Sequence, residues 1–283
     1  MKTALVFYFF GLAPGFLFAQ MVDTAAVRRE VDSLLAVSRK LVEERKFDEA
    51  MVVGEYAANV VVSKIGKASV EYANYLINKG RLFYREGQYI DAEEMFLEAK
   101  NIHELNFGKS SKDFAAVLYA LASVYVQTRR FDLAEKCYNE AKDIYGFILG
   151  SNSMPYCKCL VGLSTTHQYT GRLETALILI KEAKSILLKE VSGKDNPSYP
   201  EILNNMGNVC TEMGAYSDAE RCFQEAKQIW AKSKGLNSRE YSIGLGNLAI
   251  LFAKLGRFDN AEEAFRELVE IREKAYGKTD PEY

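Results

Sequence analysis

The feature that most constrains this sequence is an alanine that returns at an almost constant interval along the chain. It stands at Ala50, Ala92, Ala134, Ala176, Ala219 and Ala261, each three residues after a bulky side chain. The successive separations are 42, 42, 42, 43 and 42 residues. A constant period of this length indicates a repeat architecture, in which every unit is one supersecondary element. The chain is therefore expected to fold as an array of six units.

Two further positions of the repeat predict how each unit is built. A small residue lies twelve positions before each alanine, in the series Ser38, Gly80, Ala122, Ser164, Gly207 and Ala249. The bulky residue before the alanine is Phe47, Tyr89, Phe131, Leu173, Tyr216 or Phe258. Small side chains let two helices approach closely, and the bulky side chain can plug the turn between them. Each unit is thus predicted to be a helix, a tight turn and a second helix.

The second helix of each unit carries a further apolar stripe. Its members lie three and ten residues after the alanine, and this separation of seven places them on one helical face. They are Val53 and Val60, Met95 and Ile102, Cys137 and Ile144, Leu179 and Ile186, Cys222 and Ile229, and Ala264 and Ile271. A lone helical pair cannot bury such a face, so stability is expected to come from stacking. We assign the stripe to contacts with the first helix of the next unit.

Position by position, this pattern resembles the tetratricopeptide repeat, and its long period resembles the kinesin-light-chain type found widely in bacterial proteins. The later positions of the repeat motif are filled by Phe96, Tyr138, Ile180, Phe223 and Phe265, then by Ala99, Ala141, Ala183, Ala226 and Leu268. The resemblance covers residues 24–283 and implies an all-α fold, a right-handed α-solenoid of stacked helix-turn-helix units. The units would span about 24–66, 67–108, 109–150, 151–193, 194–235 and 236–278.

A recurring glycine is expected to end each unit, at Gly66, Gly108, Gly150, Gly193, Gly235 and Gly277. In the segment Gly193–Tyr199, Asn196 is predicted to cap the next helix and Pro197 to open it. Asp280 and Pro281 occupy the corresponding places near the C-terminus, so residues 279–283 read as the start of a seventh unit.

The last complete unit has no following helix in this sequence. We expect Ala264, Leu268 and Ile271 to leave apolar surface there, so that the chain continues beyond Tyr283 or self-associates through its last helix.

The N-terminus predicts export from the cytoplasm. Residues 1–19 carry one cation, Lys2, then an apolar run from Ala4 to Phe18 and a small residue, Ala19. This is the pattern of a signal peptide cleaved after Ala19, and the run is short for a membrane span. We therefore expect a periodic array at residues 20–283 with no membrane span after cleavage, located in the periplasm or outside the cell.

The charge pattern argues against a nucleic-acid or membrane-surface partner. The net charge is −2, with 36 basic and 38 acidic residues interspersed rather than grouped in blocks. No basic stripe is present that could follow a phosphate backbone. The five prolines form no linker, so a single continuous domain is expected.

The sequence offers little for catalysis or metal binding, and we expect neither an enzyme nor a cofactor. Only two histidines occur, and His167 falls on a position that is aromatic or apolar in other units, which favours a packing role. His103 has no neighbouring ligand, so a zinc site is not expected. The pair Cys157 and Cys159 matches neither a redox nor a metal motif, and the five cysteines are expected to be free thiols, with a disulfide left open as the alternative.

In the resembling family, the first helices build a concave face around the small position. The polar residues expected there are Asn74, Asn78, Arg81, Tyr84, Arg85, Tyr119, Ser123, Gln127, Gln168, Tyr169, Asn204, Asn205, Asn208 and Asn247. Asn78, Asn205 and Asn247 share one phase, and an amide there can both donate to and accept from an extended peptide. The alternative is a solvated face, or asparagines that serve neighbouring helices. A clamp for acidic C-terminal tails is not expected in the fifth unit, because Asn204 stands at its lysine position.

The sequence therefore predicts a non-enzymatic scaffold whose concave groove binds a protein or peptide. The alternative is the regulatory or sensor region of a longer protein, since such arrays resemble parts of proteins with a caspase-like peptidase of the CHAT type or a sensor kinase. Fold alone does not decide between these two functions.

Overall fold

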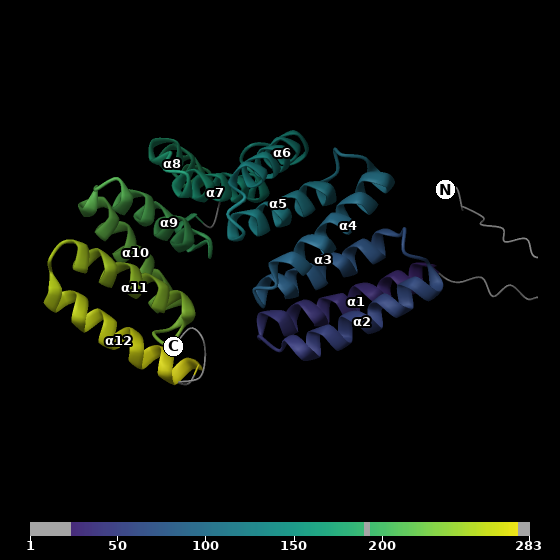
Figure 1. Ribbon diagram of the computed structural model, residues 1–283, viewed down its shortest axis with the longest axis horizontal. Helices are drawn as coiled ribbons and strands as arrows, with labels where there is room; N and C mark the ends of the chain where they lie inside the picture. Colours follow the sequence, from purple (N-terminus) through teal and green to yellow (C-terminus); the bar gives the residue numbers. More distant parts are fainter. Residues whose placement is uncertain (1–23, 190–192, 277–283) are drawn as a thin grey trace, which may run out of the picture.

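The computed structural model describes residues 24–189 and 193–276, and within these ranges the chain is entirely helical apart from turns. Twelve α-helices follow one another along an arc, from α1 and α2 at one end to α11 and α12 at the other (Figure 1). Their bounds are α1 Thr24–Glu43, α2 Phe47–Lys64, α3 Val70–Arg85, α4 Tyr89–Phe107, α5 Lys112–Gln127, α6 Phe131–Leu149, α7 Met154–Tyr169, α8 Leu173–Lys189, α9 Tyr199–Glu212, α10 Tyr216–Lys234, α11 Arg239–Lys254 and α12 Phe258–Tyr276. A 3₁₀ turn, Gly193–Asp195, precedes α9.

The helices form six antiparallel pairs that stack in sequence order. Each second helix packs on its own first helix, as α4 does on α3, and the second helices of the first five pairs also pack on the first helix of the next pair, as α4 does on α5. The first helices α1, α3, α5, α7, α9 and α11 also contact one another in succession, whereas the described second helices of adjacent pairs do not. The first helices therefore line the inner side of the arc, and the second helices form its outer side (Figure 1).

The close approach within each pair depends on the small residue that the sequence singles out. A methyl group added at Gly207 would lie 2.5 Å from the ring of Phe223, and one added at Gly80 would lie 2.7 Å from Phe96. Where the residue is serine, its hydroxyl donates across the pair, for example from Ser164 to the carbonyl of Ala176 at 2.8 Å. The six repeating alanines are all buried, which confirms the predicted helix contact.

The turn within each pair requires a left-handed backbone conformation five residues before the repeating alanine. Glycine provides it in four pairs, but Arg45 and Arg129 occupy it with φ of 60° and 57°. Each second helix then begins on the predicted bulky residue. Four of these side chains are half-buried. Phe258 is instead 70% exposed and does not fill the turn of its pair, because no further described helix covers it.

Serines open several first helices. The Ser69 side chain accepts a hydrogen bond from the backbone N–H of Tyr72 at 3.2 Å, and Ser111 and Ser238 make the same contact in their units. Such side chains satisfy donors that the first helical turn leaves unpaired. Asp280 and Pro281, predicted to do this for a seventh unit, lie outside the described residues.

The predicted start of α9 is wrong by two residues. The helix begins at Tyr199 rather than Pro197, and Pro200 stands in its first turn. Asn196 does not cap the helix, because its side chain accepts a hydrogen bond from the backbone N–H of Ser198 at 3.0 Å and so closes the preceding loop. This is the usual way in which asparagine stabilises a turn.

In the first five pairs, nine of the ten stripe residues belong to the apolar clusters or pack against them, the exception being Val53, but the expectation for the last pair is wrong. Ala264, Leu268 and Ile271 are all buried in the same apolar cluster as residues of α11. The apolar side chains that α12 exposes are instead Phe265 and Val269, together with Phe258. At the phase of Phe265, the four preceding pairs bury Phe96, Tyr138, Ile180 and Phe223 to 4% exposure or less. Hence α12 does present an uncovered apolar face, but a different one from that predicted.

Candidate functional site

A pocket of about 600 Å³ opens on the inner side of the N-terminal half of the array. Its lining comes mainly from α1, α3 and α5, which lie next to one another in Figure 1, with one residue each from α4 and α7. The residues are Arg39, Val42, Glu43, Asn78, Arg81, Tyr84, Arg85, Phe96, Ala116, Tyr119, Ala120, Ser123 and Lys158. Six of the residues predicted for the concave face are among them, namely Asn78, Arg81, Tyr84, Arg85, Tyr119 and Ser123.

Helical spacing and repeat phase bring these side chains together. Asn78, Arg81 and Arg85 lie three and then four residues apart on α3, so they share one face of that helix. Arg39 on α1 has the same phase as Arg81, because each directly follows the small residue of its unit. On α5 the corresponding surface carries Ala116, whose small side chain leaves room for the pocket.

The pocket gathers cations that have no partner within the described part of the chain. Arg39, Arg81, Arg85 and Lys158 line it, and the described residues provide no ion pair or hydrogen bond to their charged groups. The pKa of Arg81 is lowered, first because surrounding atoms shield it from water and second because the like charge of Arg39 is near. Glu43 is the one acid in the lining.

Neutral hydrogen-bond donors complete the lining. Asn78 is 6% exposed, and its Nδ2 has no hydrogen-bond partner within the described residues. Burial raises the pKa of Tyr84, and burial raises the pKa of Tyr119 to about 12, so both hydroxyls are protonated at neutral pH. An unpaired buried amide is costly unless a ligand or water supplies an acceptor. The pocket is therefore rich in donors and poor in acceptors.

A smaller pocket of about 170 Å³ continues the first along the inner side. Tyr84, Tyr119 and Ser123 line both pockets, and Gln127 and Thr165 extend the second toward α7. Gln127 Nε2 donates to the Tyr84 hydroxyl at 3.3 Å, which links α5 to α3. The two pockets together form a groove across the first helices of the first four pairs, α1, α3, α5 and α7, and we call it the inner groove.

The remaining predicted residues lie outside these pockets. Asn247 Nδ2 donates to Asn204 Oδ1 at 2.7 Å, so these two amides join α11 to α9, as in the alternative in which asparagines serve neighbouring helices. Gln168 Nε2 similarly donates to a carboxylate oxygen of Glu212 at 2.6 Å. Tyr169 stacks on the ring of Phe131 with centroids 5.7 Å apart.

Three further asparagines, Asn74, Asn205 and Asn208, are half-buried. Their side-chain amides make no hydrogen bond within the described residues. They leave their amides available on the same side of the array.

Several residues of the pocket were not predicted. The unpredicted charged residues are Arg39 and Glu43 of the first unit and Lys158 of the fourth. Their positions within the repeat nevertheless indicate that they lie on the inner side. Arg39 and Arg81 are equivalent, as are Lys158 and Asn74. Comparing equivalent positions across all six units would have found these charges.

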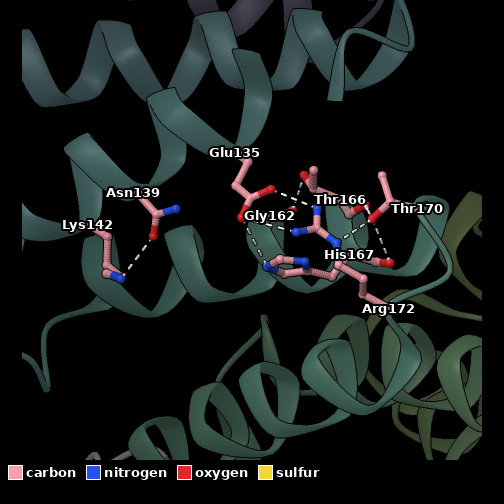
Figure 2. A network of polar contacts seen from close by, with 8 residues as sticks. All are labelled: Glu135, Asn139, Lys142, Gly162, Thr166, His167, Thr170 and Arg172. Carbon is pink, nitrogen blue, oxygen red and sulfur yellow. Dashed lines mark hydrogen bonds and ion pairs between the residues drawn. The ribbon is translucent and has the colours of Figure 1, made fainter. Parts of the chain in front are cut away.

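A polar network also joins the third and fourth pairs, and its charged residues do not line the inner groove (Figure 2). Glu135 on α6 accepts two hydrogen bonds from Arg172, at 2.7 and 3.4 Å, and lies 3.7 Å from Nε2 of His167. The bond from Arg172 lowers the pKa of Glu135. Arg172 Nε also donates to Thr170 at 3.0 Å, which fixes the turn after α7.

The same contact recurs along the array, since Arg130 pairs with Glu93 and Arg257 with Glu220. His167 is buried, in agreement with its predicted packing role, and its pKa is lowered chiefly by burial. The network therefore has a structural explanation, because it and its two equivalents fasten α4, α6 and α10 to the turn of the following pair.

The cysteines and His103 are also explained by packing. None of the five cysteines, all of which lie in the described ranges, forms a disulfide, and four of them are buried. His103 is fully buried, and neither ring nitrogen has a partner in the described part of the chain. Across residues 24–189 and 193–276, no group of three His, Cys, Asp or Glu side chains could hold a metal ion, and no helix is long and apolar enough to span a membrane.

Comparison with known families decides what this architecture is. A sequence model of the tetratricopeptide repeat matches residues 113–189 and 198–274, together more than half of the chain. The chain belongs to the tetratricopeptide-repeat family. The family accounts for the paired helices and for the α-solenoid, both of which the sequence predicted. No curated protein matches the sequence.

Solved structures confirm the tetratricopeptide-repeat fold at low sequence identity. BtubC (BKLC) from P. vanneervenii matches with a TM-score of 0.64 and 22% identity over 75% of this chain and 84% of its own. A Rap protein complexed with Competence and Sporulation Factor matches with a TM-score of 0.64 and 16% identity, over 88% and 78% of the two chains. NprR in complex with its cognate peptide NprX gives 0.64 and 15%, over 92% and 82%. At these identities the likeness shows the fold alone.

Proposed function

We propose that this tetratricopeptide-repeat array is a non-enzymatic interaction module that binds an extended peptide segment in its inner groove. The observation that carries the proposal is the inner groove itself, where α1, α3, α5 and α7 converge on about 600 Å³ lined by unpaired donors. Ligand pockets commonly have this volume, with a few polar groups that fix the orientation of the ligand. Backbone carbonyls of a peptide would supply the acceptors that the groove lacks.

Two of the similar structures support this reading. The Rap protein was solved in complex with Competence and Sporulation Factor and NprR in complex with its cognate peptide NprX, and both structures align with most of this chain. Fold likeness alone does not transfer a ligand, so the proposal rests on the groove of this chain.

The proposal is tested by filling the pocket and measuring peptide binding. Ala116→Trp places a large side chain in the lining, whereas Val52→Trp adds the same side chain on the outer surface of α2, where Val52 is 69% exposed. We expect peptides selected on the parent chain from a random synthetic library to bind Ala116→Trp at least tenfold more weakly and Val52→Trp unchanged. Equal binding by the parent and Ala116→Trp would contradict the inner groove as the site.

A second proposal concerns self-association through α12. Phe265 and Val269 are 41% and 45% exposed on one helical face, where a shallow apolar depression also involves Glu262 and Arg266. Covering such a face against a second copy would remove apolar surface from water. Light scattering should show association that Phe265→Glu disrupts, and a monomeric parent chain would contradict this proposal.

Export and the regulatory alternative remain proposals drawn from the sequence. The signal-like segment at residues 1–19 lies outside the described residues, and mass spectrometry of protein recovered outside the cytoplasm should find Gln20 at its N-terminus. Material that retains Met1 would contradict cleavage. The array could equally serve as the regulatory part of a longer protein with a CHAT-type peptidase or a sensor kinase, and the gene sequence beyond Tyr283 distinguishes these cases.

A further inference from the structure

We propose that the outer side of the array carries a second binding site, which takes a short linear amphiphile with an anionic head, such as a medium-chain fatty acid. The site is a pocket of about 260 Å³ between α4 and α6, with α5 as its floor. Its walls include Leu97 and Lys100 of α4 and Leu133, Lys136, Cys137 and Glu140 of α6, and we call it the outer pocket. It shares no lining residue with the inner groove, so the proposal goes beyond the peptide-binding function.

The floor of the outer pocket is an apolar track along α5. Phe114, Leu118, Leu121 and Tyr125 form it, and their spacing of three or four residues places them on one helical face. At about 1.5 Å per residue, the track is about 16 Å long. Arg130 lies at the end beside Tyr125, with its guanidinium carbon 4.6 Å from the centre of that ring. A volume of 260 Å³ spread along this track is narrow, which suits a linear chain better than a ring or a helix.

Two exposed leucines make the walls apolar in this gap of the array. Leu97 is 38% exposed and Leu133 is 43% exposed, and both line the outer pocket. The residues equivalent to Leu97 in the other pairs are Glu55, Asn139, Lys181, Gln224 and Arg266. Those equivalent to Leu133 are Glu49, Asp91, Thr175, Asp218 and Asn260. Stacking of the pairs therefore does not require leucine at either position, and apolar side chains gathered at a surface pocket mark a contact site.

The floor departs from the repeat at Phe114. The equivalent residues in four other pairs are tyrosines, namely Tyr72, Tyr156, Tyr199 and Tyr241. The Tyr199 hydroxyl donates a hydrogen bond to Glu225 at 3.0 Å. Glu140 is equivalent to Glu225 but accepts no hydrogen bond within the described residues, because Phe114 has no hydroxyl. Lys100 Nζ stands 5.7 Å from the centre of the Phe114 ring, so a cation lies at this end of the track.

The outer pocket carries the charge that an anionic head needs. Lys100 and Lys136 form no ion pair within the described residues, and both line the pocket. Lys109 also lines it and is paired with Glu104 at 3.3 Å, an exposed contact of the kind that contributes little to stability. Glu140 is the one acid in the lining, so the net charge of the pocket is positive. A carboxylate head is therefore attracted to the lysines while its chain covers the apolar track.

Cys137 provides a local readout of binding. It is half-buried in the wall of the outer pocket, whereas the other four cysteines are buried. The full chain is treated with N-ethylmaleimide at pH 8, with and without decanoate, and the modification of each cysteine is followed by mass spectrometry. We expect decanoate to slow the modification of Cys137.

Two related probes separate the contributions of chain and head. Octanoate, which is shorter by two CH₂ groups, should need about a tenfold higher concentration for the same protection of Cys137. Decanol has the chain without the charge and should need about a fivefold higher concentration than decanoate. Equal protection by decanol and decanoate would overturn the role of the lysines and, with it, the anionic ligand.

Variants of the chain connect the protection to the outer pocket. Leu133→Asp introduces the residue that Asp91 provides in the second pair, and it should weaken decanoate protection about tenfold by removing apolar surface and adding a like charge. Ile178→Asp changes a side chain that is 66% exposed on α8, outside the pocket, and serves as the matched control. Should Leu133→Asp fail to fold by circular dichroism, Phe114→Tyr replaces it, because its hydroxyl would occupy the end of the track beside Glu140.

Equal modification of Cys137 with and without decanoate would overturn the proposal, as would equal protection of the parent chain and Leu133→Asp. A parent oligomer that Leu133→Asp dissociates in light scattering would also overturn it and assign the outer pocket to a second copy of the chain. Ala116→Trp should retain full decanoate protection, since Ala116 lines the inner groove alone. Failure of decanoate binding therefore leaves the peptide-binding proposal untouched, and the reverse also holds.

Discussion

The close packing within each helix pair predicts opposite effects for two Gly→Ala substitutions. In α9, Gly207 faces Phe223, and a methyl group there would lie 2.5 Å from a ring that is 1% exposed and cannot swing into solvent. In α2, Gly54 has its nearest neighbours at 3.6 Å from Ser38 and 3.8 Å from Tyr75, which are ordinary contact distances. Both glycines lie inside helices, so both substitutions receive the same benefit from helix propensity.

The magnitudes follow from these distances. Replacing glycine by alanine in a helix interior stabilises the folded state by about 1 kcal/mol. Gly54→Ala should therefore raise the free energy of unfolding by about that amount. Forcing a methyl group into a packed core costs about 1–3 kcal/mol, and the 2.5 Å contact favours the upper part of that range. The net effect of Gly207→Ala is then a loss of about 1–2 kcal/mol, which separates the two variants by about 2–3 kcal/mol.

Urea unfolding measures the difference with two probes. Trp230 is the only tryptophan, lies buried in α10 of the same pair as Gly207, and reports locally by fluorescence, whereas far-ultraviolet circular dichroism reports on all helices. Because repeat arrays are stabilised between neighbours, Gly207→Ala should lower the midpoint of the Trp230 transition most. Gly54→Ala should raise the midpoint seen by circular dichroism. A Gly207→Ala variant as stable as the parent would show that α9 and α10 are not packed as closely as described.

Three other perturbations have defined outcomes. Burial lowers the pKa of His103 below its ordinary value of 6.5, so the unfolded chain binds a proton more readily than the folded chain. The free energy of unfolding should therefore fall as the pH drops below about 6.5. His103→Leu should flatten this pH dependence, and an unchanged dependence of stability on pH would contradict the reasoning. All five thiols should react with an alkylating reagent in denaturant, and fewer than five reactive thiols would reveal a disulfide. In the native chain, Cys159 should resist alkylation at pH 8, because burial raises its pKa to about 12. Ile271→Glu should unfold α12 because Ile271 is buried, whereas Phe265→Glu should leave helicity intact, and the reverse order by circular dichroism would contradict the burial assigned to this helix.

The helix pairs could be predicted because their contacts repeat. The small residue, the bulky residue and the alanine recur at fixed spacing, so one unit predicts the helix contacts of the next. The backbone conformation of the turns could be predicted less well. In two pairs Arg45 and Arg129 take the left-handed conformation that glycine usually provides. The residue type at these two positions does not signal that conformation.

The inner groove could be predicted only in part. Asn78 and Arg81 were found because they follow the repeat phase on a single helix. Arg39 and Lys158 were missed although they are equivalent to Arg81 and Asn74, and what no single unit reveals is that four first helices converge on one pocket. Asn247 was assigned to ligand binding, yet its amide already donates to Asn204, and no sequence pattern reveals how side chains pair between helices. The exposed face of α12 was predicted wrongly. The prediction assumed that the apolar stripe assigned to contacts with the next pair would be uncovered in the last pair, whereas this stripe is buried with residues of α11.

A crystal structure of the full chain with a peptide selected from the random synthetic library would test the central claim most directly. The account predicts the peptide along the first helices α3, α5 and α7, with a peptide oxygen within hydrogen-bonding distance of Asn78 Nδ2. A peptide bound on the outer second helices, or on the exposed face of α12, would contradict it.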